Sequence, residues 1–218
     1  RFFIGSLSLV PLIYKKSLKP YFVKKNLLYI LPTSILFFLY NICFFIATDI
    51  GEAGRGSVLV TTINPIFTVL LMSLITKKIN LREFTGVCLG ILGGLIIMNI
   101  FQVGILNIFS LNNIYFLFCG IIWGIMTVLM NYGQKNMDSF QFIFICYLFT
   151  SIISLIIFDF EVLYKIELDN IFFLNFFIVS IGAMSFGTSV YMYLTPVLGP
   201  KKVSVFIFSV PLISMTIA

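Results

Sequence analysis

The sequence predicts an all-α integral membrane protein, a helix bundle that crosses a lipid bilayer about eight times. Sixty per cent of its residues are hydrophobic, only 10% are charged, and the mean hydropathy is +1.11. Soluble domains carry roughly a quarter charged residues. The apolar runs are continuous rather than alternating, which favours membrane helices over the strands of a barrel. Charge is also divided unevenly between alternate loops.

The apolar segments are residues 1–14, 27–48, 57–76, 84–101, 114–133, 139–158, 171–195 and 204–218. Most have about 18–25 residues, the length that a helix needs to cross a hydrocarbon core of about 30 Å. The first and last are too short for a full crossing. Because the sequence starts with Arg and stops within an apolar run, we expect a fragment cut inside a helix at both ends.

Basic residues concentrate in every second loop. One set of alternate loops carries 11 basic and 2 acidic residues, and the other carries 2 basic and 6 acidic residues. The basic residues of the first set are Lys15, Lys16, Lys19, Lys24, Lys25, Lys77, Lys78, Arg82, Lys135, Lys201 and Lys202. Since Lys and Arg are retained on the cytoplasmic side, this set is predicted to face the cytoplasm. The net charge of +6 is thereby assigned to membrane orientation and not to nucleic-acid binding.

The residue inventory argues against most catalytic chemistry. The chain contains no His, so zinc sites and Ser-His or Cys-His catalysis lose their usual partner. The four cysteines, Cys43, Cys88, Cys119 and Cys146, fall inside apolar segments and are interpreted as packing residues. We therefore predict no enzyme activity, no metal site and no cofactor.

An internal repeat is visible when the chain is shifted against itself by 146 residues. Phe3, Ser8 and Leu9 fall on Phe149, Ser154 and Leu155; Asn41-Ile42-Cys43 falls on Gly187-Thr188-Ser189; Ala53-Gly54-Arg55 falls on Gly199-Pro200-Lys201. The third match lies ten residues ahead of Pro65 in one copy and of Pro211 in the other. Five predicted helices separate the paired elements. This odd number predicts an inverted-topology repeat, which is typical of secondary transporters.

Several motifs along the chain resemble one family. They are Arg1-Phe2-Phe3, Phe45-Ile46-Ala47, Gly54-Arg55-Gly56-Ser57-Val58-Leu59, Asn64-Pro65-Ile66-Phe67-Thr68, Lys77-Lys78-Ile79-Asn80-Leu81-Arg82-Glu83, the glycines 86, 90, 93 and 94, and Trp123-Gly124. This order of small-residue turn, proline-centred helix, charged loop and glycine-rich helix is similar to the EamA-type transporters of the drug/metabolite transporter (DMT) superfamily. The sequence departs from the pattern at Asn64 and at the Lys201-Lys202 turn.

The resemblance implies ten helices in two inverted five-helix repeats. Residues 1–101 would then form the first repeat, with helices 2–5, and residues 114–218 the second, with helices 6–9. The first and last helices of the family would be missing. The implied function is secondary transport by alternating access, and we expect export of a small metabolite or amino acid across the plasma or inner membrane.

The candidate substrate-binding residues are Asn41, Asn64, Trp123, Tyr191 and Tyr193. The two asparagines offer paired donor and acceptor atoms that suit an amide or amino-acid-like solute, and the aromatic rings suit a flat one. The alternative is that the asparagines hydrogen-bond between helices and the rings fill space. No segment core contains Asp, Glu, Lys or Arg apart from Arg1, which favours a neutral, zwitterionic or largely apolar solute.

Prolines and glycines complete the predicted machinery. Pro65 and Pro211 are expected to act as paired hinges or kinks, because proline removes a backbone hydrogen bond within a helix. The close-contact glycines Gly86, Gly90, Gly94, Gly120 and Gly124 are expected to pack helices within the bundle, with dimerisation as the alternative. A membrane-embedded enzyme or assembly protein is the alternative function class, and a channel is a third. We make no prediction of the oligomeric state.

Overall fold

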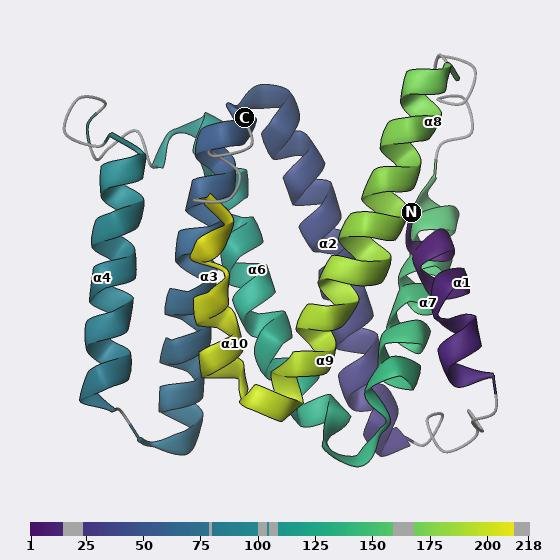
Figure 1. The fold of residues 1–218 in the computed structure, drawn as a ribbon, viewed down its shortest axis with the longest axis horizontal. Helices are drawn as coiled ribbons and strands as arrows, with labels where there is room; N and C mark the ends of the chain where they lie inside the picture. Colours follow the sequence, from purple (N-terminus) through teal and green to yellow (C-terminus); the bar gives the residue numbers. More distant parts are fainter. Residues whose placement is uncertain (15–23, 79, 100–103, 105–108, 159–167, 212–218) are drawn as a thin grey trace. The chain divides into compact units, whose positions relative to one another are not determined.

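A computed structural model describes residues 1–14, 24–78, 80–99, 104, 109–158 and 168–211. These residues form helices and contain no strand. The elements are α1 (Phe2–Ile13), α2 (Lys24–Ile50), α3 (Ala53–Thr76), α4 (Leu81–Ile97), α6 (Leu111–Gly133), η3 (Gln134–Asn136), α7 (Ser139–Ile157), α8 (Asn170–Phe177), η5 (Ile178–Thr188), α9 (Ser189–Leu198) and α10 (Pro200–Phe206), as Figure 1 shows. Parts of the predicted charge pattern, at 15–23 and 159–167, and the end of the last segment, 212–218, lie outside the described residues.

Five helical stretches are long and apolar enough to cross a membrane. They are Lys24–Ile50, Gly56–Thr76, Asn113–Gly133, Ser139–Ile157 and Asn170–Leu198. The other predicted crossings correspond to shorter helices, because α1 has 12 residues, α4 has 17 and α10 has 7. The predicted all-α membrane architecture is confirmed.

Helix boundaries differ from the predicted segments by a few residues, and polar caps explain several of the differences. The Asn80 side chain accepts a hydrogen bond from the Arg82 amide, so α4 begins at Leu81 rather than at 84. Asp138 and Asp169 cap α7 and α8 by accepting from amides of the first turn. Such caps satisfy amides that the first helical turn leaves without a partner.

The predicted turn at Lys201 and Lys202 is wrong. Gly199 adopts φ 87°, a left-handed conformation that glycine tolerates, and Pro200 then occupies the first turn of α10. Proline at the start of a helix is favourable because its missing amide would have no helical partner there. Both lysines consequently belong to the first turn of α10 and precede the predicted segment 204–218.

The rod formed by α8, η5 and α9 contains a π-helix that the sequence did not predict. Residues 171–195 were expected to form one regular helix, and the chain is continuously helical from Asn170 to Leu198, but Ile178–Thr188 is π-helical. Hydroxyl side chains follow this wider spacing, since Ser185 donates to the Ser180 carbonyl and Thr188 to the Ala183 carbonyl, each five residues back. π-helical segments are rare and frequently occur at functional sites.

The chain divides by its contacts into two units. Unit 1 comprises Arg1–Phe38 and Tyr132–Val197, and unit 2 comprises Leu39–Asn131 and Leu198–Ala218. Helix α2 contributes its first half to unit 1 and its second half to unit 2. These units are defined by contacts and do not test the predicted sequence repeats 1–101 and 114–218, which stay a prediction.

The interior of unit 1 lies between α1, α7 and η5. The rings of Phe2, Phe37 and Tyr147 pack at centroid distances of 5.7 to 5.9 Å. Tyr147 is fully buried, and its hydroxyl donates to the Met184 carbonyl of η5 at 3.0 Å. One turn further along α7, Thr150 donates to the Ser34 carbonyl of α2 at 3.1 Å. Large side chains and hydroxyl groups therefore connect the helices of this unit.

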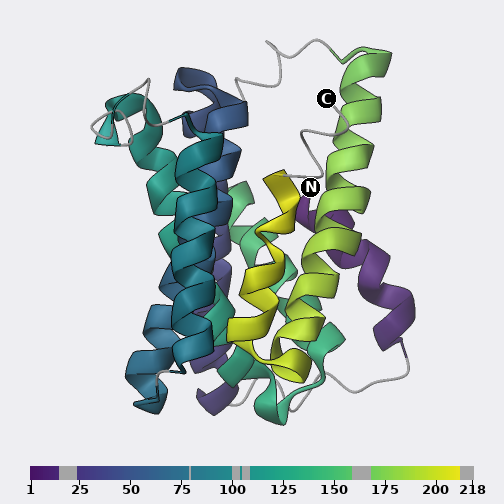
Figure 2. The ribbon, with the colours of Figure 1, turned by 60° about the vertical axis from the view of Figure 1, so that its left-hand side comes forward.

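Unit 2 is organised by α3, which packs against both α4 and α10. Helices α3 and α4 are joined by a tight turn, where Lys77 has φ 53°, and run antiparallel (Figures 1 and 2). Helix α10 begins near this turn, because Lys201 contacts Lys78 and Glu83. It therefore runs antiparallel to α3. An inverted repeat requires this direction for the pair, since the 146-residue shift places α10 on α3.

Candidate functional site

The candidate site in unit 2 begins with the close packing of α6 on α3. A Cβ atom added at Gly120 would lie 2.6 Å from the Ile63 Cβ, and one at Gly124 would lie 3.3 Å from the Asn64 carbonyl oxygen. Near the starts of the two helices, Gly56 lies against the Phe116 ring. Contacts thus progress in the same direction along both helices, so α3 and α6 run parallel with little space between their backbones.

This parallel packing places two of the predicted outer loops at one end of unit 2. Helix α3 begins after Glu52 and helix α6 begins after residue 110, and both of these helix starts lie at the Gly56–Phe116 end. The predicted cytoplasmic residues Lys78 and Lys201 lie together at the end where α3 stops. The structure therefore agrees with the alternation of loop charge for these four loops.

Trp123 and Asn41 lie in one region of unit 2. The Trp123 ring lies 4.8 Å from the Tyr40 ring, and the Cys119 thiol donates to the Tyr40 carbonyl at 3.6 Å. Asn41, the next residue along α2, is 7% exposed. The second half of α2 thus brings the Tyr40 ring against α6 and carries a buried amide at the next position. Aromatic rings can stack on a flat solute, and an amide can hydrogen-bond to one.

Asn64 lies on α3, opposite the glycines of α6. Its side chain is 1% exposed, and its Oδ1 accepts a hydrogen bond from the Thr68 hydroxyl at 3.1 Å. Thr68 itself is fully buried. This bond joins two residues of α3, whereas the alternative role predicted for Asn64 is a hydrogen bond between helices. The Asn64 backbone carbonyl also lies at the Gly124 contact, so the residue combines a polar group with tight packing.

Tyr191 and Tyr193 belong to unit 1. Tyr193 is 41% exposed and stacks on Phe140 with a centroid distance of 5.2 Å and an interplanar angle of 18°. Tyr191 is half-buried, and its carbonyl accepts from the Thr195 hydroxyl. Of the five predicted substrate-binding residues, unit 2 therefore holds Asn41, Asn64 and Trp123, and unit 1 holds the two tyrosines.

The two predicted hinge prolines are both buried in unit 2. Pro65 lies inside α3, which continues to Thr76, and Pro211 is the last described residue after α10. Pro211 also lines a groove of about 340 Å³ with Thr62, Phe208 and the glycine face of α4. The hinge role stays a prediction, and the positions show that both prolines lie along the contacts of α3, α4 and the α10 segment.

The glycines of α4 differ from one another. Gly90 lies against the Phe208 ring, and a Cβ at Gly94 would lie 2.5 Å from the Thr62 hydroxyl oxygen. At Gly86, which was also expected to make a close helix contact, no atom of another helix lies within 4 Å of an added Cβ. Gly86 instead borders the groove, because the segment after α10 meets α4 one turn further along.

Charged side chains are absent from the interior of the described residues. The buried polar side chains there are those of Ser, Thr, Asn and Gln, together with Tyr147, and none is Asp, Glu, Lys or Arg. The four cysteines are free thiols, of which Cys119 and Cys146 are buried. Within the described ranges, no three His, Cys, Asp or Glu side chains gather as a metal-ligand set. The arrangement can therefore bind by hydrogen bonds and ring contacts.

Sequence reasoning missed the polar interior of unit 1. Besides its bond to Met184, the Tyr147 hydroxyl lies 3.4 Å from the Ser189 hydroxyl. Gln134, 5% exposed, donates from Nε2 to the Met192 carbonyl at 3.1 Å. The sequence did show a few polar side chains within apolar segments. Such side chains occur both in solute sites and in packing contacts, so they did not distinguish one from the other.

The comparisons with known proteins agree with the motifs. The sequence model of the EamA-like transporter family matches residues 1–99 and 110–218. These two segments together cover most of the chain. No curated protein and no solved structure matches it.

Proposed function

We propose that this chain, which belongs to the EamA-like transporter family and is a multi-pass membrane transporter, exports a small uncharged or zwitterionic metabolite, such as an amino acid. The family match carries the transport function. The solute class, the direction and the alternating-access mechanism are the parts that we propose, together with a location in the plasma or inner membrane.

The uncharged interior supports the solute class. Ionisable side chains within membrane segments usually mark ion pathways and bind charged groups. The buried polar side chains of the described residues are instead hydroxyls and amides. A fully ionic solute such as a phosphorylated sugar needs cationic partners, which are the residues that bind phosphate well. An amide or an amino acid can be satisfied by uncharged donors and acceptors.

Asn41 and Trp123 are the proposed solute-binding pair. Asn41 is buried on α2, and Trp123 packs beside Tyr40, the residue that precedes Asn41. Asn64 is a weaker candidate because its Oδ1 already accepts from Thr68. We therefore do not place the Asn64 side chain among the proposed solute-binding groups and assign it to the hydrogen bond within α3.

The decisive test is solute flux in proteoliposomes made with the full-length protein. A panel of neutral amino acids, amides and phosphorylated sugars is loaded, and efflux is measured per folded molecule. We expect Asn41→Leu and Trp123→Ala to abolish flux while the protein stays monodisperse. Leu keeps the branched shape of the Asn41 side chain but removes its hydrogen bonds.

The matched control is Thr195→Val, because Thr195 is fully buried and bonds within its own helix. Its flux per folded molecule should equal that of the wild type. Normal flux per molecule in both site variants would remove Asn41 and Trp123 from the solute path. Preference for the phosphorylated sugars would contradict the proposed solute class.

A further inference from the structure

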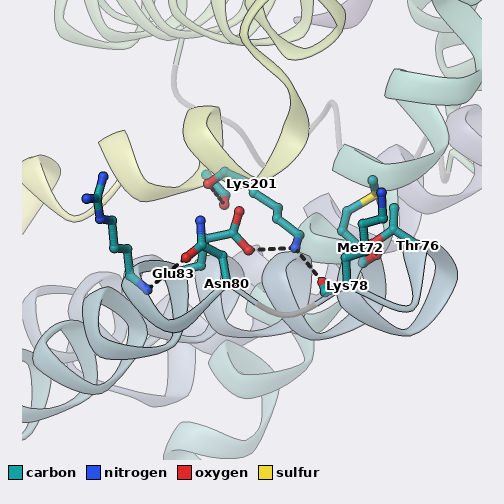
Figure 3. Close-up of polar contacts among 8 residues, drawn as sticks. Met72, Thr76, Lys78, Asn80, Glu83 and Lys201 are labelled. Atoms are coloured by element: carbon teal, nitrogen blue, oxygen red, sulfur yellow. Dashed lines mark hydrogen bonds and ion pairs between the residues drawn. The ribbon is translucent and has the colours of Figure 1, made fainter.

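Lys201 contacts both sides of the α3–α4 turn. Its Nζ lies 2.6 Å from Oε2 of Glu83, in the first turn of α4, and donates to the Lys78 carbonyl oxygen at 3.3 Å. Figure 3 shows these two contacts converging on the one ammonium group. Lys201 lies far from both partners in the chain, since it follows Lys78 by 123 positions and Glu83 by 118. One side chain thus fastens α10 to the turn.

The local structure fixes each partner. Glu83 is the third residue of α4, behind the Asn80 cap, and an acidic group in the first turn is favoured by the helix dipole. Lys201 is the second residue of α10, behind the buried Pro200. The Lys201 and Glu83 side chains are 17% and 34% exposed. Because both partners are partly withdrawn from solvent and start from fixed helix ends, their attraction is less screened than that of a free surface pair.

A second contact joins the segment after α10 to α4, two helical turns further along. Phe208 follows Lys201 by seven residues and lies against Gly90, which follows Glu83 by seven. The two segments are therefore parallel and in register. In lipid, however, an apolar contact has no hydrophobic driving force, because the tails are as apolar as Phe. Lipid can replace the Phe208 contact at small cost. The ion pair requires Lys201 beside Glu83, so it specifies one arrangement of α10 against α4.

The surrounding positive charge makes the position of α10 depend more on Glu83 than on Lys201. Lys77, Lys78, Arg82 and Lys202 are all exposed at this end. With the Glu83 carboxylate in place, Lys201 meets an opposite charge. With Glu83 replaced by an uncharged side chain, Lys201 faces a group of like charges, which repel it. Removal of the Lys201 charge should have the smaller effect, because Glu83 would still lie beside cations. The two halves of the pair are therefore not equivalent.

From these contacts we infer that Lys201 and Glu83 form a latch on the predicted cytoplasmic end of unit 2. The latch holds α10 against α4 in the conformation seen here and releases it when the protein changes conformation during transport. This inference rests on the proposed transport function, which requires at least two conformations. Lys201 and Glu83 are positioning residues in this scheme and do not touch the solute.

The test uses the full-length protein in lipid nanodiscs with a reporter cysteine at Ser204. Ser204 is fully buried in α10, one turn after Lys201. A water-soluble maleimide reacts with Ser204→Cys only when α10 moves, and peptide mass mapping separates this site from the native cysteines. We expect Glu83→Gln to raise the labelling rate about three- to fivefold, the size expected for one well-placed ion pair. Lys201→Met should raise it less.

Lys202→Met is the matched control, because Lys202 is the exposed neighbour on the same turn; its labelling rate should not change. The charge exchange of Glu83→Lys with Lys201→Glu should restore part of the protection, because position 83 lies in the first turn of α4, where the helix dipole favours an acidic group. An unchanged rate in Glu83→Gln, or an equal rise in Lys202→Met, would overturn the latch. A lower melting temperature with unchanged labelling would overturn it too, because it would show a static contact.

The outcomes also separate this inference from the proposed function. If the labelling pattern appears but the wild type transports none of the solutes in the panel, the latch stands and the proposed solute class fails. If flux is normal and insensitive to Glu83→Gln while labelling is unchanged, the latch fails alone.

Discussion

The two units hold their helices together in different ways. In unit 2, glycines let the backbone of α6 approach that of α3, so that an added Cβ at Gly124 would meet the Asn64 oxygen and the Thr68 nitrogen at 3.3 Å. In unit 1, the fully buried Tyr147 fills the space between α1, α7 and η5 and donates a hydrogen bond to η5. Backbone contacts cannot yield without moving a helix, whereas side chains can rotate. We therefore expect unit 2 to tolerate substitution less well.

The largest predicted effect is that of adding one methyl group between α3 and α6. Gly124→Ala places Cβ 2.9 Å from the Phe67 Cβ and near two backbone atoms, so the helices must separate. Overpacking of this kind costs about 1–3 kcal/mol of the free energy of unfolding. Gly5→Ala in unit 1 should cost less, because its nearest neighbour is the Tyr147 ring at 3.2 Å, which can shift slightly.

Gly86→Ala is the control for both, since no atom of another helix lies within 4 Å of its added Cβ. Its stability should equal or slightly exceed that of the wild type, because Ala favours helix more than Gly. Unfolding in mixed detergent micelles measures all three variants. A Gly5→Ala cost equal to that of Gly124→Ala would remove the proposed difference between the units.

The next effect in size concerns the Tyr147 hydroxyl. Tyr147→Phe keeps the ring against Phe2 and Phe37 but deletes the hydrogen bond to the Met184 carbonyl. We expect a loss of about 1 kcal/mol, within the range measured for hydrogen bonds between membrane helices. Tyr193→Phe should cost nothing measurable, because Tyr193 is exposed and its ring stacking is retained. Equal costs would show that the bond to η5 contributes no stability.

The same contrast explains how much the sequence could predict. The Gly-x-x-x-Gly spacing at 120 and 124 was visible because glycines at one helix face have few other uses in an apolar segment. The Tyr147 contact was not visible, because one tyrosine in a run of apolar residues carries no sign of its partner. The π-helix at 178–188 was equally hidden, because in a mostly apolar segment the periodicity that distinguishes helix types is weak.

The charged ends were predicted in part. Loop charge correctly placed Lys78 and Lys201 at the same end. It did not reveal that Lys201 pairs with Glu83, because that contact depends on Pro200 starting α10 early and on Asn80 starting α4 early. Asn41 and Trp123 were selected by residue type, and the structure adds that Tyr40 stands beside Trp123. Which polar residues meet a solute depends on side-chain geometry, which composition does not contain.

The smallest predicted effect separates a hydrogen bond between helices from one within a helix. Thr150 and Thr195 are both fully buried and both donate to the carbonyl four residues earlier. Thr150 also donates to the Ser34 carbonyl of α2 at 3.1 Å. Thr150→Val should therefore cost about 0.6 kcal/mol, the average for interhelical bonds in membrane proteins, and Thr195→Val close to zero. Val has nearly the shape of Thr, so packing contributes little to the difference. The opposite outcome is a cost of Thr150→Val no greater than that of Thr195→Val. It would mean that the rings of Phe2, Phe37 and Tyr147, and not the hydroxyl groups, hold the helices of unit 1 together.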